Sequence, residues 1–403
     1  MLTQQNMEQI EFLSGNKDML IKASSKAALP TWSEKTVDFL SAFSRNLLHH
    51  KRAHDFPDII SYAFWIRSAS LKQIKEHYYP HVENKIGRGI AFHIAPSNVP
   101  INFAVSFTSA LLAGNISIVR LSNKEFEQVD IIIEVLKETF RDGMADMENY
   151  LLLIRYGHNT EITRYLSSLC DIRVIWGGNQ TIDNIRQAAL LPRTIEMAFA
   201  DRHSMAWIDA EAILEADIEK LAKDFYTDTY YIDQNACSSP RIIIWFGENV
   251  KEAKEKFWAA IERIARKDYT MKPIQAIDKL EQFCRLAATY QNVYKENNSN
   301  RVMRIQVGQL DAKLMDYKLG GGYFFEYHAK NMEEVIPIMD KSCQTISYFG
   351  IEPHNIQQFI ITYGLRGGDR IVPIGKTMDL SFKWDGFDMI ETMSRYVYCP
   401  DYL

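Results

Sequence analysis

Residues 90–122 read IAFHIAPSNVPINFAVSFTSALLAGNISIVRLS, and this stretch decides the fold. A β-rich run at 89–95 precedes a loop bracketed by two prolines. An apolar helix at 101–114 ends at a glycine, and a strand follows at 115–121. The run from Ile90 to Val119 carries no acidic residue, Lys or Arg and is long enough to span a membrane. Its prolines and asparagines predict irregular backbone, which lipid does not tolerate, so we expect a buried strand–helix–strand unit and no membrane span.

Strands and helices alternate outward from this stretch. Helices are expected at 125–140, 159–170 and 179–190, with strands at 151–157 and 171–176 between them. The alternation repeats less regularly, with strands at 206–210 and 240–247 and helices at 213–228 and 250–266. This pattern predicts an α/β protein of two doubly wound lobes. Before them, a helix capped by Ser33 and a second helix from Pro57 to residue 75 predict a helical N-terminal segment. The end, 379–397, predicts a strand and then a helix.

Composition excludes several classes of function. The 403 residues carry a net charge of -5, so there is no basic field for nucleic acid. The five cysteines are odd in number, widely spaced and without a CxxC pair, which disfavours disulfides and a zinc site. The N-terminus lacks the basic and apolar regions of a signal peptide. We therefore expect a cytoplasmic protein.

The segment Asp233-Gln-Asn-Ala-Cys237-Ser-Ser-Pro-Arg241 lies between an expected helix and an expected strand. A cysteine at such a junction can be exposed, and nearby backbone N–H groups can favour its reactive thiolate form. Cys237 is thus a candidate nucleophile, although from this segment alone a structural cysteine remains the commoner alternative.

Three further segments could bind a substrate or cofactor. Asn98, in the proline loop, could donate to an oxyanion or could simply cap the next helix. Arg120 and Ser122 end a strand, where open parallel sheets bind ligands. Gly177 and Gly178 end another strand directly before a helix, where backbone could approach a pyrophosphate.

Taken together, these segments resemble the aldehyde dehydrogenase superfamily. The Pro-x-Asn-x-Pro loop is matched at 96–100, the alanine-rich helix ending in Gly-Asn at 110–115, and the Lys-Pro-Ser strand end at 120–122. The Thr-Gly-Ser turn corresponds to 176–178, and the catalytic Gly-Gln-x-Cys to 233–237, offset by one residue. The segments FWIR at 64–67, GRGIAFHIAPSNVPINFAVSF, LLAGNISIVRLSNKEFEQV and RIVPIGKTMDLSFKWDG resemble more narrowly the LuxC-like acyl-CoA reductases. These include the reductase of the bacterial luminescence fatty-acid reductase complex.

The resemblance implies an aldehyde dehydrogenase fold with a cofactor-binding lobe, a catalytic lobe and a small oligomerisation element. The segments expected are 1–80 (helical, packing on the cofactor domain), 81–210 (NAD(P)-binding), 211–375 (catalytic, carrying Cys237) and 376–403 (C-terminal tail). It also implies NADPH-dependent reduction of a fatty acyl-CoA or acyl-protein thioester to the aldehyde, with NADPH preferred to NADH. Cys237 would carry the acyl group and Asn98 would stabilise the oxyanion.

The same resemblance assigns cofactor binding to the strand ends, with adenosine ribose at Arg120 and Ser122. Pro96, Gly177 and Gly178 would line the rest of the cofactor site. No metal is implied. The expected partners are acyl-CoA or an acyl-carrying protein resembling an acyl-protein synthetase, and a homo-oligomer is expected.

One departure bears on the reaction. The glutamate that activates water in hydrolytic aldehyde dehydrogenases aligns with Phe199, although Glu196 and His203 lie close enough for a shifted alignment. Without that base a thioester would be protected until hydride arrives. The alternatives are a hydrolytic aldehyde dehydrogenase, a cofactor-free acyltransferase, or a non-catalytic scaffold for an acyl-activating partner.

Overall fold

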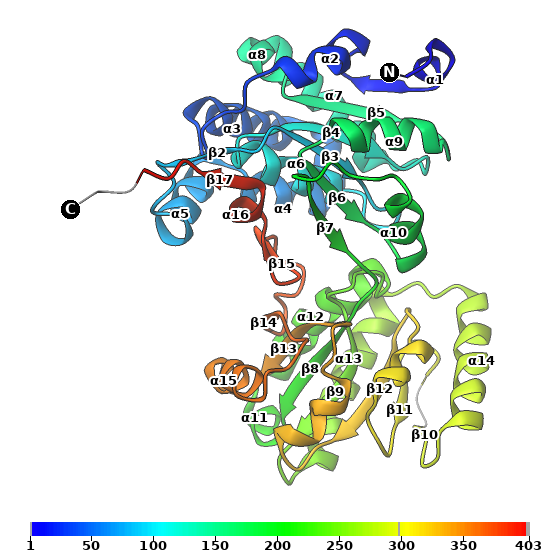
Figure 1. Cartoon of the computed structure of the whole chain (residues 1–403). Coiled ribbons are helices and arrows are strands. Elements are labelled where there is room, and N and C mark those ends of the chain that lie inside the picture. The colour runs from blue at the N-terminus through cyan, green and yellow to red at the C-terminus, as the bar shows by residue number, and fades with distance from the viewer. Residues whose placement is uncertain (1, 297–298, 400–403) are drawn as a thin grey trace. The chain divides into compact units, whose positions relative to one another are not determined.

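The computed structural model describes residues 2–296 and 299–399, so Met1 and residues 400–403 of the expected tail lie outside it. The chain forms two compact units (Figure 1). Unit 1 is Met1–Ala200 with Leu380–Leu403, and unit 2 is Asp201–Asp379. Each unit is built on its own largely parallel sheet, which confirms the predicted α/β fold class.

The sheet of unit 1 has the strand order β1-β5-β4-β3-β6-β7. Its strands are β1 (Glu11–Ser14), β3 (Ile90–Ile94), β4 (Ile116–Leu121), β5 (Leu151–Arg155), β6 (Ile172–Trp176) and β7 (Ile195–Phe199). Only β1 is antiparallel to its neighbour. Strand β3 is flanked by β4 on one side and by β6 on the other, so the direction in which the strands are added to the sheet reverses at β3. Such a switch point is where open α/β sheets bind ligands.

The sheet of unit 2 has the order β10-β11-β12-β9-β8-β13-β14. Its strands are β8 (His203–Asp209), β9 (Pro240–Phe246), β10 (Tyr294–Lys295), β11 (Met303–Gln306), β12 (Tyr323–His328), β13 (Cys343–Phe349) and β14 (Arg370–Pro373). Successive side chains of β8 enter different cores: Met205 and Trp207 join one cluster, Ala206 and Ile208 the other. Alternation of this kind shows that both faces of the sheet are covered.

The helices of unit 1 are α1 (Gln4–Glu8), α2 (Lys17–Lys22), α3 (Glu34–His49), α4 (Pro57–Trp65), α5 (Ser68–Tyr78), α6 (Asn102–Leu112), α7 (Glu127–Thr139), α8 (Ala145–Glu148), α9 (Thr160–Leu169), α10 (Asn179–Arg186) and α16 (Met389–Met393). Those of unit 2 are α11 (Ala210–Glu215), α12 (Ile218–Thr229), α13 (Val250–Asp268), α14 (Pro273–Thr289) and α15 (Pro353–Tyr363). No helix of the described ranges is both long and apolar enough to cross a membrane. The apolar run at 90–119 instead forms β3, α6 and most of β4.

Helix boundaries differ from the sequence predictions in three places. Ser33 does cap α3, its side chain accepting from the amide of Thr36. The single helix expected from Pro57 is two helices, because Arg67 takes an extended conformation between α4 and α5. The helix expected at 213–228 is likewise two, since Asp217 caps α12 by accepting from the amide of Lys220. Helix α10 ends at Arg186, four residues before the expected end.

The C-terminal segment also differs from its prediction. In place of one strand and a helix, β15 (Lys383–Trp384) and β16 (Phe387–Asp388) form a hairpin, followed by α16 and β17 (Ser394–Tyr396). The two residues between the hairpin strands, Asp385 and Gly386, have φ of 51° and 75°. Positive φ at both positions is what a tight two-residue hairpin turn requires.

The returning segment is an integral part of unit 1. Strand β17 pairs with β2 (Lys85–Gly87), and the Asn115 amide donates to the carbonyl of Met393 at 2.9 Å. Gly114, at the end of the 101–114 run, has φ of 97°, and a Cβ there would lie 2.0 Å from the carbonyl oxygen of Leu29. This turn therefore requires glycine.

A buried carboxylate on β12 holds the core of unit 2 together. Glu326 is fully buried, and its Oε1 accepts hydrogen bonds from the indole N–H groups of Trp245 and Trp258, each at 2.8 Å. Its Oε2 accepts from the Arg304 guanidinium at 2.8 Å. Removing the carboxylate would leave two indole donors and one guanidinium without their acceptor.

We therefore predict that Glu326→Ala lowers the free energy of unfolding of unit 2 by about 3–5 kcal/mol, because it leaves a buried charge unpaired. Urea unfolding followed by tryptophan fluorescence would measure the change. Glu219→Ala is the matched control: it breaks the exposed pair with Arg263, which should contribute no more than about 1 kcal/mol. Equal losses for the two variants would contradict the prediction.

Candidate active site

The proline loop and the end of β4 meet at one edge of the sheet in unit 1. Strands β3 and β4 are parallel, with Ile94 opposite Arg120, so their carboxyl ends lie side by side. Pro96 and Ser122 line the same small cavity at that edge. The Ser122 Oγ accepts from the amide of Lys124 at 3.0 Å, which fixes the turn that follows β4. Two of the predicted cofactor residues are thus adjacent.

Asn98 lies on the exposed part of the proline loop. Helix α6 begins at Asn102, and its N-cap position is Ile101 rather than Asn98. The capping interpretation of Asn98 therefore does not match the helix boundary. The role of Asn98 as an oxyanion donor stays a prediction.

Arg120 faces a second, larger cavity. Its guanidinium lies over the ring of Tyr156, 4.6 Å from the centroid, and donates to the carbonyls of Tyr156 and Gly157 at 3.4 Å. The buried Nε of Arg120 has no hydrogen-bond partner. The cavity has a volume of about 350 Å³ and is lined by Arg120, by the start of α9 and by the end of α10.

Two residues in this cavity escaped the sequence analysis. His158 and Arg164 line it together with Arg120, so three basic residues line this cavity. Arg164 also pairs with Glu161, one turn earlier on α9, and both side chains are more than half exposed. The position of His158 in the sequence could have indicated it. His158 follows the end of β5 by three residues, and the predicted cofactor residue Ser122 follows the end of β4 by one.

Gly177 and Gly178 connect β6 to α10. Gly178 occupies the N-cap position of α10, where no side chain caps the helix. A Cβ built on Gly178 would meet nothing within 4 Å, so packing does not demand glycine there, and the backbone is open to a ligand. The amide of Gly177 donates to the carbonyl of Phe199 at 3.2 Å, which ties the turn to β7.

The Cys237 loop in unit 2 has a strained but well-anchored backbone. Asp233 and Gln234 both adopt left-handed conformations, with φ of 55° and 54°. The buried Gln234 side chain accepts from the Gly322 amide at 2.7 Å and donates to the carbonyl of Pro240 at 3.1 Å. Left-handed backbone at non-glycine residues costs energy and persists only where the surroundings fix it. Here the Gln234 amide supplies that fixation.

Arg241 anchors the same loop from the start of β9. It donates to the carbonyl of Leu319 at 2.6 Å and to the carbonyl of Gln234. Burial lowers the pKa of Arg241 to about 10, with the Cys237 thiol first among the groups that oppose the shift. The two side chains thus interact electrostatically.

Cys237 itself is half-buried. The hydroxyl of Ser204 on β8 donates to the Cys237 carbonyl at 2.6 Å and accepts from the Thr345 amide at 3.1 Å. The other cysteines have different settings. Burial raises the pKa of the Cys170 and Cys343 thiols to about 12, which makes them inert. Cys284 lies exposed on α14.

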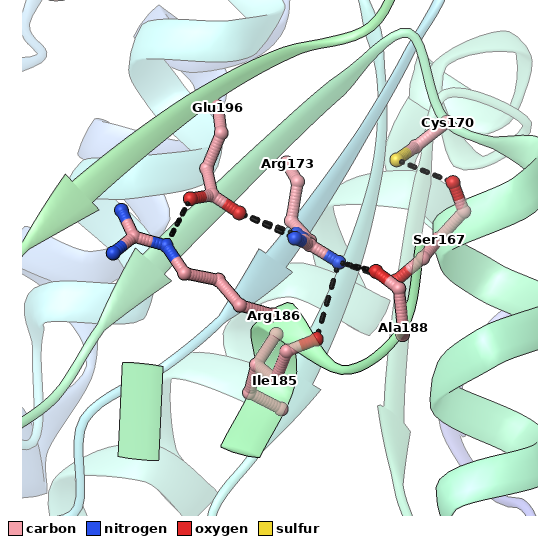
Figure 2. A network of polar contacts seen from close by, with 7 residues as sticks. All are labelled: Ser167, Cys170, Arg173, Ile185, Arg186, Ala188 and Glu196. Atoms are coloured by element: carbon pink, nitrogen blue, oxygen red, sulfur yellow. Dashed lines mark hydrogen bonds and ion pairs between the residues drawn. The ribbon is translucent and has the colours of Figure 1, made fainter. Parts of the chain in front are cut away.

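The residue aligned with the water-activating glutamate lies in an apolar environment. Phe199 is buried at the end of β7 and stacks on Trp176 with ring centroids 3.7 Å apart. Glu196, which a shifted alignment would place at the glutamate position, forms ion pairs with two arginines. Its two carboxylate oxygens are held by Arg173 and Arg186 (Figure 2). Both oxygens of this carboxylate are therefore engaged in ion pairs within unit 1.

The other alternative, His203, is buried on β8 of unit 2. Its Nδ1 lies 3.2 Å from Ser342 Oγ, and burial lowers its pKa to about 3. Within the described ranges, 2–296 and 299–399, no three His, Cys, Asp or Glu side chains are grouped as a metal site. Cys237 and the strand ends of unit 1 stay the predicted sites.

Comparison of the sequence with known families decides the relationship. The family described as acyl-CoA reductase (LuxC) matches residues 17–396. The chain belongs to the LuxC family. The predicted resemblance is confirmed.

Two relatives show how far the likeness extends. The long-chain acyl-protein thioester reductase of Photorhabdus laumondii is 24% identical over 340 residues, covering 81% of this chain and 67% of that protein. The reductase of the same name from Photorhabdus luminescens is 25% identical over 317 residues, covering 75% of this chain and 62% of that protein. The chain thus spans about two thirds of the length of these LuxC relatives.

Solved structures establish the fold of this LuxC-family chain. Aldehyde dehydrogenase 21 from Physcomitrella patens superposes with a TM-score of 0.65 at 11% identity, covering 94% of this chain and 88% of that one. A 1-pyrroline-5-carboxylate dehydrogenase mutant from Thermus thermophilus gives 0.63 at 12% identity, with 95% and 85% covered. The predicted aldehyde dehydrogenase fold is confirmed.

The histidine beside the proline loop makes a testable contribution to stability. His93 on β3 is fully buried, its Nδ1 lies 2.7 Å from Ser106 Oγ, and that hydroxyl accepts from the Trp176 indole at 3.0 Å. Burial lowers the pKa of His93 from 6.5 to about 3. Between these two values the unfolded chain binds the proton and the folded chain does not. Stability therefore falls as pH falls through this window and is unaffected by His93 above it.

We predict that His93→Gln flattens the acid side of the stability profile by about 1.4 kcal/mol per pH unit, since one histidine no longer titrates on unfolding. Urea unfolding at a series of pH values within the window would give the slope. His203 is unchanged in both proteins, so the difference in slope reports His93 alone. Parallel profiles would show that His93 is already protonated in the folded state.

Proposed function

We propose that this chain reduces a long-chain acyl thioester to the aldehyde, with Cys237 as the acyl carrier and NADPH as the hydride donor. The observation that carries the proposal is the Cys237 loop in a chain of the LuxC family. The cysteine is half-buried, its carbonyl is fixed by Ser204, and it interacts electrostatically with the cationic Arg241. These are the conditions under which a thiolate is both available and held in place.

The chemistry at Cys237 proceeds in two stages. The thiolate attacks the acyl carbonyl carbon, a new C–S bond forms, and the thiol of the donor leaves, so that an acyl thioester remains on Cys237. Asn98 and the Cys237 backbone N–H are the donors proposed for the oxyanion, and one such donor lowers a barrier by about 3–4 kcal/mol. Reduction at the thioester carbon gives a hemithioacetal, which collapses to the aldehyde and frees the thiolate.

The residues of unit 1 fit a nicotinamide cofactor, which would supply the hydride when bound. The unpartnered Nε of Arg120 and the open space beside Gly178 both lie at the switch-point edge, where such cofactors bind. We assign adenosine ribose to Arg120 and Ser122, and the pyrophosphate region to Gly177, Gly178 and Pro96. The amides at the start of α10 are suited to an anion.

The basic residues that line the large cavity favour NADPH over NADH. Arg120, Arg164 and His158 line one cavity at the end of β4, and guanidinium groups bind phosphate with paired hydrogen bonds. A 2′-phosphate on the adenosine ribose would match this charge. NADH has no such phosphate to offer these side chains.

The surroundings of Phe199 favour reduction over hydrolysis. An apolar stack occupies the aligned position of the water-activating base, and Glu196 is held by two arginines. An acyl-enzyme without a base nearby should persist until hydride arrives. This observation argues against the hydrolytic alternative, and the anchored Cys237 loop argues against a scaffold that has lost its site.

The acyl donor is proposed from the relatives. Both Photorhabdus proteins are named long-chain acyl-protein thioester reductases, which supports an acyl-carrying protein as donor, with acyl-CoA as the small-molecule equivalent. We further propose a homo-oligomer acting in the cytoplasm, with luminescence as one pathway that such an aldehyde would serve.

One prediction of the proposed function concerns the nucleophile, Cys237. Cys237→Ala should reduce acyl-thioester-dependent NADPH oxidation by about three orders of magnitude or more, because no other group can take over the covalent step. NADPH binding, followed by its fluorescence, should be unchanged. Cys284→Ala removes an exposed cysteine on α14 and is the matched control, expected to keep full activity. Activity retained in Cys237→Ala would disprove the mechanism.

A further prediction of the proposed function concerns the stability of the acyl-enzyme. Mixing the enzyme with long-chain acyl-CoA in the absence of NADPH should release about one equivalent of CoA per Cys237 and then stop, because no base activates water. Thiol titration would follow the burst, and mass spectrometry would locate the acyl group. Continuous release of CoA and free fatty acid would favour a hydrolytic enzyme instead.

A further inference from the structure

Arg173 is a buried cation that lies near the start of β6 in unit 1. Its side chain is 2% exposed, and it carries hydrogen bonds to three neighbouring elements (Figure 2). On β7, Glu196 Oε2 accepts from Nε at 2.8 Å and from Nη2 at 2.5 Å. Arg173 is thus paired with a carboxylate that is itself largely buried.

The remaining donor, Nη1 of Arg173, points away from the carboxylate toward α9 and the end of α10. It donates to the carbonyl of Ala188 at 2.7 Å, to that of Ile185 at 3.3 Å and to Ser167 Oγ at 3.1 Å. Carbonyls at a helix C-terminus carry partial negative charge, so a cation stabilises them. Arg173 therefore fixes where α10 ends and how far it lies from α9.

The same two helices form the walls of the large cavity. Ile185 and Ala188, whose carbonyls Arg173 holds, line it on the α10 side. Thr163 and Arg164 of α9 line it on the other side, and Ser167 lies one turn further along that helix. Arg173 itself does not reach the cavity. Its Nη1 alone contacts both walls, by donating to Ser167 of α9 and to the carbonyls of Ile185 and Ala188 at the end of α10.

We propose that Arg173 is a positioning residue for the adenosine end of the cofactor, and that it sets the width of the cavity between α9 and α10. This inference rests on the proposed function, in which that cavity takes NADPH. Glu196 assists by orienting the guanidinium: with its Nε and Nη2 held by the carboxylate, Nη1 is directed at the helix ends. The planar fork of arginine is needed, because a lysine ammonium could not serve the carboxylate and both walls together.

Arg186, the last residue of α10, provides an internal control, since its side chain belongs to the same charge cluster but does not line the cavity. Its Nε donates to Glu196 Oε1 at 2.7 Å, and its side chain is 53% exposed. An exposed ion pair of this kind contributes little. If net charge around Glu196 were what mattered, loss of Arg186 and loss of Arg173 would have similar effects on cofactor binding.

The test measures NADPH affinity by fluorescence titration, together with the KM for NADPH and for acyl-CoA. Arg173→Met keeps the bulk of the side chain but removes its donors. It should raise the Kd and KM for NADPH about 10-fold to 100-fold, the range expected when a binding group is displaced by about 1 Å. The KM for acyl-CoA and the kcat at saturating NADPH should stay within about twofold, because Cys237 is untouched. Arg173→Lys should fall between wild type and Met, and Arg186→Gln should bind NADPH like wild type.

Circular dichroism and melting temperature establish that each variant is folded. If Arg173→Met does not fold, Glu196→Gln serves in its place, with a smaller rise in the NADPH Kd and again no change for acyl-CoA. A folded variant of either kind that binds NADPH like wild type, or an equal loss in Arg186→Gln, overturns the inference. Wild-type protein that fails to bind NADPH overturns the proposed cofactor as well. The two failures are therefore distinguishable.

Discussion

Parallel strand pairing is the constraint on which both units depend. A sheet that is covered on both faces is largely apolar along its strands, so ligands bind at the strand ends. The register of β3 on β4 sets Ile94 against Arg120, which brings the proline loop and Ser122 to one edge. Cys237 likewise lies just before β9, next to the central strand of the second sheet. The location of the proposed chemistry follows from the pairing.

Much of the fold could be predicted from local pattern. Strands such as β3 are apolar runs between glycine and proline signals, and Ser33 caps its helix by a contact three residues away. The breaks at Arg67 and Asp217 could not be predicted in the same way. Both interrupt sequences with continuous helical periodicity, and each break contains one residue with extended backbone, Arg67 in the first and Ala216 in the second. Helical periodicity is a pattern over many residues, so a break at a single position does not show in it.

The residues of the candidate site likewise divide into those that local sequence predicts and those that it does not. Cys237 and Arg120 could be found because they stand at the junctions of predicted elements. The role of Gln234 could not be found, since its side chain meets the amide of Gly322, 88 residues further on. Arg173 is a stronger case: a charged residue inside an apolar strand gave no hint that Glu196 and two helix ends lie around it. Contacts between residues remote in sequence leave no trace in local composition.

The path of the chain through unit 1 has a consequence for biosynthesis. Unit 2 is one continuous segment, whereas unit 1 is interrupted by it and resumes only at Leu380. The residues that cover α6 and pair with β2, among them Met389 and Met393, are therefore translated after the whole of unit 2. Until they emerge, nascent unit 1 exposes apolar surface that the finished protein buries. Exposure of this kind promotes aggregation, so the order of synthesis gives chaperones a defined interval in which to act on this chain.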